Sequence, residues 1–237
     1  MEYNLYTLFL IFFIYSILGY IIESTFVSIN RKEAVFSRGF LIGPYLPIFG
    51  FGGLFMTLTL EKYSNDLFAL FIMSMVSCLI LEYVSSYILE KLFKLRWWDY
   101  SEKRFNLNGR ICLEIGLMFG VAGVISIKFI NPIIKKLFTI IPDKILIILA
   151  IIFAVIIIID FIISTKTVIK FKDNFARYTK DSTGEVKAKV LEELSKNSFF
   201  IKRLIKSFPN AKDKLNKYKE LREQYYKKLK IKSKNMK

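Results

Sequence analysis

The sequence predicts an all-α, polytopic membrane protein with five transmembrane helices, the N-terminus outside and the C-terminus inside, followed by a basic cytoplasmic helical tail. Three observations lead to this fold class. Hydrophobic residues make up 54% of the chain and its mean hydropathy is +0.39, which is unlike an ordinary soluble domain. The apolar residues come in runs close to the ~18–20 residues that cross a bilayer. The net charge of +16 lies almost entirely in residues 164–237, which hold 22 basic and 8 acidic side chains.

The apolar runs divide residues 1–165, the predicted transmembrane domain, into five spans, and residues 166–237 form the predicted tail. The first residues, MEYNLY, lack the basic start of a secretory signal, so we expect the first span to remain in the mature protein. The tail has a lysine-rich amphipathic pattern interrupted by Pro209, which predicts a short helical hairpin. The predicted spans are residues 5–29, 43–60, 67–89, 111–130 and 145–163.

The second span differs from the others because its first half, GPYLPIFGFGG, is rich in residues that break helices. Pro44 and Pro47 remove helical hydrogen bonds, and Gly43 and Gly50 lower helix propensity. In lipid such a segment needs protein or water around it to satisfy the freed carbonyls. We therefore expect a kinked helix inside the bundle.

Basic residues in the connecting segments predict the orientation. With the N-terminus outside, the inner segments hold three basic residues (30–42), six (90–110) and the 22 of the tail. The outer segments hold none before the first span, one in 61–66 and four in 128–144. Cytoplasmic loops carry the excess of lysine and arginine, so this orientation is favoured. The outer connection 131–144 contains an amphipathic IIKKLF and is expected at the membrane surface.

Residues 96–114, RWWDYSEKRFNLNGRICLE, form a polar segment between the third and fourth spans. Tryptophan and tyrosine are typical of the headgroup level of a membrane, which is where we expect Trp97, Trp98 and Tyr100. Amide side chains and glycine favour turns, and three residues predict one here: Asn106, Asn108 and Gly109.

Acidic residues fall within four of the predicted spans at a similar depth near the cytoplasmic side: Glu23, Glu82, Glu114 and Asp160. The adjoining loops contribute further charged residues, namely Arg38, Arg96, Asp99, Arg104 and Arg110. Intramembrane charges are costly and often mark a pathway, so these residues are candidates for a polar vestibule or ionic belt open to the cytoplasm. Structural ion pairs and snorkelling side chains are the alternative. That alternative is favoured for Asp160 and stays open for Glu23 and Glu82.

The composition excludes several kinds of chemistry. The chain has no histidine, which removes Ser-His-Asp and Cys-His catalysis and histidine metal sites. Its two cysteines, Cys78 and Cys112, fall in or beside apolar runs and are expected to be buried thiols. No G-x-x-x-x-G-K-[ST] loop occurs, so the chain cannot be a nucleotide-hydrolysing subunit. We expect no catalytic residues, no metal and no cofactor.

An offset of 66 residues relates two parts of the chain. Arg38, Gly43 and Gly50 recur as Arg104, Gly109 and Gly116. In both places an acid-bearing span precedes a basic loop, and a glycine-rich span follows it. The pattern suggests that the first two spans and the next two are parallel duplicates, as in many transporters, although the intervening residues barely match and chance is the rival explanation.

Three motifs resemble the ABC-transporter type IV, or CmpB-like, family of bacterial integral membrane proteins: LGYIIES at 18–24, RGFLIGPYLPIFGFG at 38–52, and LEYVSSYILEKLF, WWDYS and FNLNGRICL across 81–113. The resemblance covers residues 10–165 and leaves out the tail. Two positions depart from the family pattern: Tyr20 stands where tryptophan is frequent, and Glu114 where an apolar residue is usual. The positions that match are Glu23, Arg38, Gly39, Gly43, Pro44, Glu82, Trp97, Trp98, Asp99, Tyr100, Asn106, Gly109 and Arg110.

The resemblance implies a multi-pass protein of the bacterial plasma membrane with a role in transport. The chain would be a permease-type subunit, with a separate ATPase docking on residues 96–110 or with a second copy of itself as partner. The alternatives are a non-transporting scaffold, sensor or assembly factor, and a lipid-modifying membrane enzyme. The partners expected are the bilayer and, for the basic tail, anionic lipid headgroups. Nucleic acid is a less favoured partner for that tail.

Overall fold

The computed structural model describes residues 3–31, 39–93 and 96–180 of the 237. It is mostly helical, and four of its helices are long and apolar enough to cross a membrane: Leu5–Ile29, Leu67–Leu92, Leu113–Ile140 and Asp143–Ile169. These correspond to the first, third, fourth and fifth predicted spans. The predicted helical hairpin of the tail, beyond residue 180, lies outside the described residues, as does Arg38.

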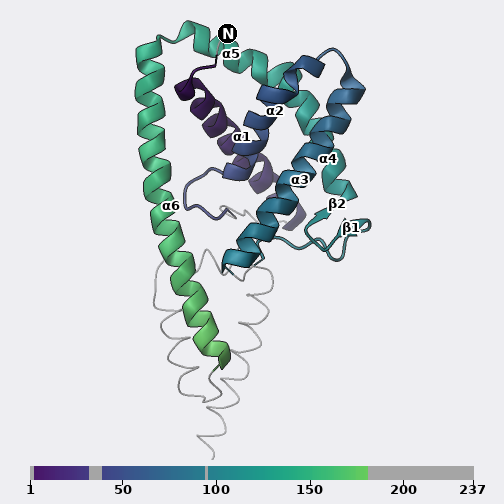
Figure 1. Ribbon diagram of the computed structural model, residues 1–237, viewed down its shortest axis with the longest axis vertical. Helices are drawn as coiled ribbons and strands as arrows, with labels where there is room; N and C mark the ends of the chain where they lie inside the picture. Colours follow the sequence, from purple (N-terminus) through teal and green to yellow (C-terminus); the bar gives the residue numbers. More distant parts are fainter. Residues whose placement is uncertain (1–2, 32–38, 94–95, 181–237) are drawn as a thin grey trace, which may run out of the picture.

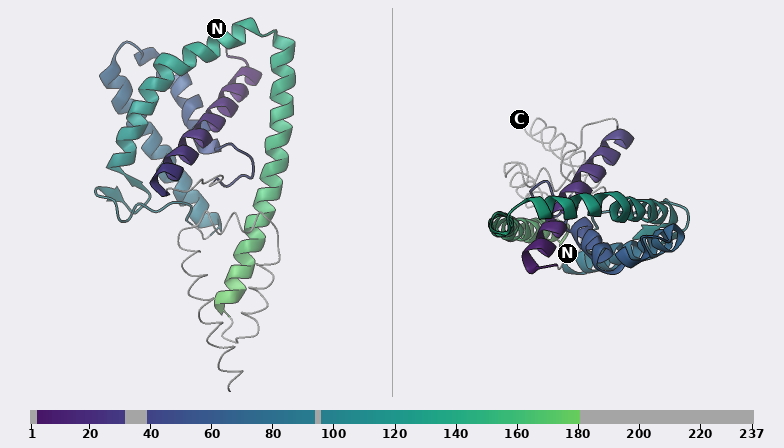
Figure 2. Two further views of the ribbon diagram at one scale, coloured as in Figure 1. Left: turned by 180° about the vertical axis from the view of Figure 1, so that it is seen from behind. Right: turned by 90° about the horizontal axis from the view of Figure 1, so that it is seen from above.

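The elements follow one another in a simple order (Figure 1). Helices α1 to α4 run in alternating directions along the bundle, and α5 crosses one end of it to reach the long α6 (Figure 1). Figure 2 shows α1 crossing one face of the bundle obliquely. The bounds are α1 Leu5–Arg31, α2 Pro47–Thr59, the 3-10 turn η1 Glu61–Tyr63, α3 Leu67–Phe93, strands β1 Asn106–Leu107 and β2 Ile111–Cys112, α4 Leu113–Ile125, the π-helical turn η2 Ser126–Ile130, α5 Asn131–Ile140, and α6 Asp143–Lys180.

The second predicted span is wrong in its helical bounds. The sequence predicts a kinked helix over 43–60, whereas α2 begins at Pro47 and has 13 residues, about 20 Å at ~1.5 Å per residue. Proline fits the first helical position because its missing N–H needs no partner there, and Pro44 keeps the residue before it out of the helical region. Residues 39–46 therefore approach the helix in non-helical backbone, and Leu46 N donates to Ser16 O at 2.9 Å.

The helix of the fourth predicted span is longer than predicted. Helix α4 begins at Leu113 and continues through the π-helical turn into α5, instead of ending at residue 130. A π turn followed by Pro132 is a known cause of a change in helix direction. The amphipathic IIKKLF segment lies in α5, whose Ile134 and Phe138 are buried against α1 and α6.

Helix starts follow local chemistry. Asp66 caps α3, since its side chain accepts from Ala69 N at 2.9 Å and its carbonyl accepts from Leu70 N. One core cluster lies where α1 packs on α5 and α6, and a second where α1 and α6 meet the segment 39–46. A third cluster joins α2, α3 and the π-helical turn after α4. Isoleucine side chains of α6 remain largely exposed, as lipid-facing residues are in a membrane protein.

Candidate functional site

The polar segment between α3 and α4 folds into a small antiparallel hairpin, residues 96–112, at the end of the bundle away from α5 (Figure 1). Its turn is held by Asn106, whose amide oxygen accepts from Gly109 N at 3.0 Å and whose amide nitrogen donates to Ser101 O and Lys103 O. Tyr100 N donates to Gly109 O at 2.8 Å. The predicted turn is confirmed, and the two short strands beside it were not predicted.

Gly109 has a positive φ of 66°, which residues with a side chain rarely adopt. A Cβ placed there would lie 2.7 Å from Asp99 Oδ1 and 3.0 Å from Arg96 Nη1. Asp99 accepts from Ser101 N at 3.0 Å. Burial alone would raise the pKa of Asp99, but the hydrogen bonds from Ser101 and the nearby Arg96 guanidinium lower that pKa below its ordinary value.

One face of α3 receives the hairpin. Glu82, Ser86 and Glu90 follow one another at intervals of four residues, so they share a side of the helix. Glu90 Oε2 accepts from two of the three hairpin arginines, Arg96 at 3.2 Å and Arg110 at 2.8 Å. Because one carboxylate serves two guanidinium groups, Glu90 fixes both ends of the hairpin to α3.

Arg110 is the most enclosed of these basic groups, with 12% of its side chain exposed. Its guanidinium donates to Ser86 Oγ at 3.1 Å and lies 5.7 Å and 5.5 Å from the ring centres of Tyr83 and Tyr87. These are cation–π distances. Its carbonyl accepts from Trp98 Nε1 at 3.0 Å.

Two further contacts join the hairpin to its surroundings. Asn108 Nδ2 donates to Tyr83 Oη of α3 at 2.9 Å. Trp97 is buried, and its ring meets that of Phe40 edge to face with centres 5.9 Å apart. Phe40 follows Gly39 in the non-helical segment 39–46 before α2, so this segment and the hairpin after α3 lie side by side.

Glu82 is the most deeply buried acid of this end, with 6% of its surface exposed. Its Oε1 accepts from Tyr100 Oη at 3.1 Å, whereas its Oε2 is buried and has no hydrogen-bond partner among the described residues. Burial raises the pKa of Tyr100 above its ordinary value, and the carboxylates of Glu82 and Glu23 raise it further. Side chains of α1, α3 and the hairpin therefore converge on one buried acidic spot.

Asp160 of α6 makes a different kind of site. Its Oδ1 accepts from Ile42 N at 2.9 Å and Ser164 Oγ at 2.8 Å, and its Oδ2 accepts from Gly43 N at 2.7 Å and Tyr45 Oη at 2.6 Å. The carboxylate thus satisfies the backbone donors freed by the non-helical Gly43–Pro44 segment. Two backbone and two side-chain donors thus give Asp160 a structural role, and no described residue forms an ion pair with it.

The other belt candidates are spread apart. Glu114 is 54% exposed and pairs with Lys103 at 2.8 Å on the outer side of the hairpin. The Glu114 carboxylate raises the pKa of the Lys103 ammonium. Arg104 is exposed, and no described residue forms an ion pair with it. Arg110, expected near the intramembrane acids, has Glu90 as its ion-pair partner.

Sequence reasoning missed Glu90 and the two tyrosines that enclose Arg110. The spacing of Glu82, Ser86 and Glu90 could have shown that Glu90 extends the acidic face of α3. It also missed a cluster at the opposite end, where Lys135 of α5 pairs with Glu61 and Tyr3 Oη donates to Glu61 at 3.1 Å.

Comparison with known proteins adds one finding to this geometry. A family model described as Putative ABC-transporter type IV matches residues 10–165, about two thirds of the 237 residues. The matched part begins in α1, contains the hairpin and Glu82, and ends in α6 after Asp160. No curated protein and no solved structure matches the chain. The chain belongs to the Putative ABC-transporter type IV family.

Proposed function

We propose that this chain is the membrane-embedded, permease-type subunit of a transport system, with a polar vestibule that opens toward the hairpin. The buried Glu82 carries the proposal. Burying a carboxylate oxygen away from any donor is costly, and an intramembrane acid of this kind usually serves a substrate, an ion or a proton. Tyr100 of the hairpin donates to Glu82, and Glu23 of α1 would line the approach to it.

The contrast with Asp160 supports a functional role for Glu82. Both acids are buried, at 8% and 6% exposure, and both belong to membrane-length helices. Asp160 uses both oxygens on fixed donors of the protein. Glu82 uses only Oε1, so its second oxygen is free to accept from a group that enters the vestibule.

The arrangement of the chain supports five passes with the hairpin on the cytoplasmic side. The segment before α2, the hairpin and the far end of α6 lie toward one end of the bundle, while the N-terminus, η1 and α5 lie toward the other (Figure 1). The described parts of the segments predicted as basic and inner lie at the end with the hairpin, which agrees with the positive-inside rule. In this proposal α2 and residues 39–46 together make the second pass.

Contacts at the end of the bundle that holds the N-terminus and α5 support a vestibule that is closed on that side. The Lys135–Glu61 ion pair joins α5 to the turn before α3, and Tyr3 donates to the same carboxylate. Tyr6 Oη donates to Asp143 Oδ1 at 3.1 Å and adds α6 to this cluster. These contacts tie the N-terminus, η1, α5 and α6 together, which supports the proposal of an inward-facing state.

A separate ATPase subunit would drive accumulation against a gradient, whereas the membrane subunit alone would let solute enter vesicles down its gradient. The hairpin is the proposed docking surface, since its tip presents Phe105, 81% exposed, and Leu107 beside the exposed Arg104. An apolar patch with a basic rim is a common form of protein interface. The basic tail would hold the cytoplasmic side against anionic lipid headgroups.

The test is solute uptake by proteoliposomes. The purified protein is reconstituted, the vesicles are incubated with the small-molecule fraction of a cell extract, and the retained solutes are identified by mass spectrometry. We expect at least one solute to be retained above protein-free vesicles, and Glu82→Gln to lower its retention about ten-fold, the effect of losing one charge-assisted contact.

The matched control is Glu102→Gln, which changes an exposed acid of the hairpin. It should leave uptake unchanged. Size-exclusion elution of each variant verifies that it is folded. If no solute is retained by the native protein, the chain is not a transport subunit on its own, and the scaffold alternative takes its place. If Glu82→Gln folds and retains solute normally, the vestibule assignment is wrong.

A further inference from the structure

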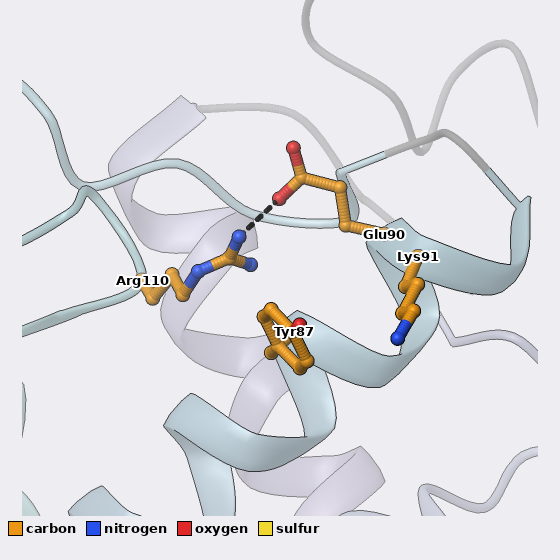
Figure 3. A pocket seen from close by; sticks show the side chains of 4 residues that line it. All are labelled: Tyr87, Glu90, Lys91 and Arg110. Atoms are coloured by element: carbon orange, nitrogen blue, oxygen red, sulfur yellow. Dashed lines mark ion pairs between the residues drawn. The ribbon is translucent and has the colours of Figure 1, made fainter.

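A shallow pocket of about 270 Å³ lies near the C-terminal end of α3, beside the hairpin (Figure 3). It is lined by Tyr87, Glu90 and Lys91 of α3 and by Arg110 of the hairpin. The side chains of Arg110 and Lys91 approach the Tyr87 ring, whose centre lies 5.5 Å and 5.9 Å from their respective charged groups. Two cations from different elements thus border one concave surface.

The charge of this pocket is unbalanced toward the positive. Glu90 is the one acid that lines it, and its Oε2 is already shared by Arg110 and Arg96. The lining therefore holds two cations, Arg110 and Lys91, against one carboxylate, and Arg96, which lies outside the lining, pairs with Asp99 as well. Arg110 is held in place by Ser86 and two tyrosine rings, which orient its guanidinium before any ligand arrives.

The depth of the pocket matches the headgroup layer of a membrane. Helix α3 has 27 residues, about 40 Å at ~1.5 Å per residue, whereas the hydrocarbon core is ~30 Å thick. Tyr87 lies 20 residues after Leu67, so the side chains from Tyr87 onward lie roughly 30 Å or more along the helix. Trp98, whose Nε1 donates to Arg110 O, is typical of the same level.

We propose that this pocket binds the phosphate of an anionic membrane phospholipid between Arg110 and Lys91. Guanidinium and ammonium groups are the usual partners of phosphate oxygens, and the apolar exposed face of α3 continues from the pocket into the region of the lipid tails. A volume of 270 Å³ corresponds to roughly nine water molecules at ~30 Å³ each, which is enough for a phosphate and part of a headgroup. This site is separate from the basic tail and does not rest on transport.

Tryptophan fluorescence provides a local test, because the two tryptophans of the chain, Trp97 and Trp98, both lie in the hairpin. The full chain is reconstituted in two series of phosphatidylcholine vesicles. In one series a rising fraction of the lipid is brominated phosphatidylglycerol, and in the other it is brominated phosphatidylcholine. Bromine quenches tryptophan fluorescence at short range. The ratio of quenching in the two series therefore measures how strongly the anionic lipid is preferred near the hairpin. We expect a clear preference in the native protein.

Two single-charge variants distinguish a specific lipid site from unspecific attraction of anionic lipid to basic residues. Lys91→Gln removes a cation that lines the pocket and should lower the preference about five-fold, the usual effect of one basic residue near an anionic surface. Lys103→Gln removes a cation of the neighbouring hairpin that pairs with Glu114 outside the pocket. This change should alter the lipid preference less than two-fold. Both side chains are exposed, so neither change threatens the fold.

Three outcomes would overturn the proposal. Equal losses in Lys91→Gln and Lys103→Gln would show unspecific attraction of anionic lipid. A native protein with no preference for phosphatidylglycerol would have no such site. A preference abolished by 10 mM inorganic phosphate at constant ionic strength would assign the pocket to a soluble phosphate instead of a lipid.

Discussion

Asp160→Asn is expected to lower the free energy of unfolding by about 2–4 kcal/mol, since buried donors left without an acceptor cost ~1–3 kcal/mol each. Each oxygen of Asp160 accepts one backbone N–H, from Ile42 and from Gly43. An asparagine has only one acceptor oxygen, so in either orientation its amide nitrogen faces a backbone donor. The Gly43–Pro44 segment would lose its anchor on α6.

Thermal unfolding in detergent measures this loss, with a thiol-reactive dye reporting exposure of the buried Cys112. We expect the midpoint to fall by roughly 5–15 °C, given ~2–4 °C for each kcal/mol in a chain of this size. Asp143→Asn is the matched control, because Asp143 lies in the same helix and accepts a single exposed hydrogen bond from Tyr6. A midpoint shift for Asp160→Asn no larger than that of the control would contradict the anchoring role.

Gly50→Ala is expected to destabilise the packing of α1 on α2 by about 1–3 kcal/mol, the usual result of overpacking a tight contact. A Cβ at this position would lie 2.2 Å from Ser16 Oγ and 2.6 Å from Phe12 O. The second atom is backbone of α1, so the two helices would have to move apart. Close approach through glycine is how membrane helices gain their contacts.

Gly52→Ala supplies the comparison within the same helix. A Cβ there meets Cys78 Sγ at 3.9 Å, an ordinary contact. Alanine is the better helix former by ~0.5–1 kcal/mol, so this change should leave the unfolding midpoint unaltered or raise it. The same dye assay applies to both variants. If Gly50→Ala and Gly52→Ala unfold at the same temperature, the close contact between α1 and α2 is not present in the folded protein.

The family and the long apolar helices could be predicted from the sequence, because both depend on local signals. Hydropathy over about 20 residues identifies a membrane-length helix without knowledge of its neighbours. The turn at Asn106, Asn108 and Gly109 is similarly local, since Asn108 and Gly109 adopt positive φ angles of 54° and 66°. The family motifs are likewise read from contiguous residues.

The second span could not be predicted correctly because its structure depends on a distant residue. Hydropathy places 43–60 in the membrane but does not show that the chain stays non-helical until Pro47. What makes that backbone stable is the acceptor Asp160, more than 110 residues further along the chain. Sequence periodicity carries no information about such a partner.

The candidate site could be predicted only in part, because the partners of its side chains also lie far away in the sequence. Counting residues along helices gives a depth for Glu82 and Arg110, but it does not give the direction in which each side chain points. Arg110 therefore was expected among the intramembrane acids, whereas it pairs with Glu90, two turns further along α3 than Glu82. Glu114 lies at a similar depth and faces outward to Lys103.

Water access to Glu23 is the most direct test of the vestibule. In a background of Cys78→Ser and Cys112→Ser, the variants Glu23→Cys and Val76→Cys are each exposed to a membrane-impermeant maleimide from one side of the membrane at a time. Glu23 lies on the proposed vestibule, and Val76 is an exposed apolar residue of α3 that faces lipid. We predict that Glu23→Cys reacts from the side of the C-terminus and not from the other side, while Val76→Cys reacts from neither. A Glu23→Cys variant as unreactive as Val76→Cys from both sides would contradict the vestibule.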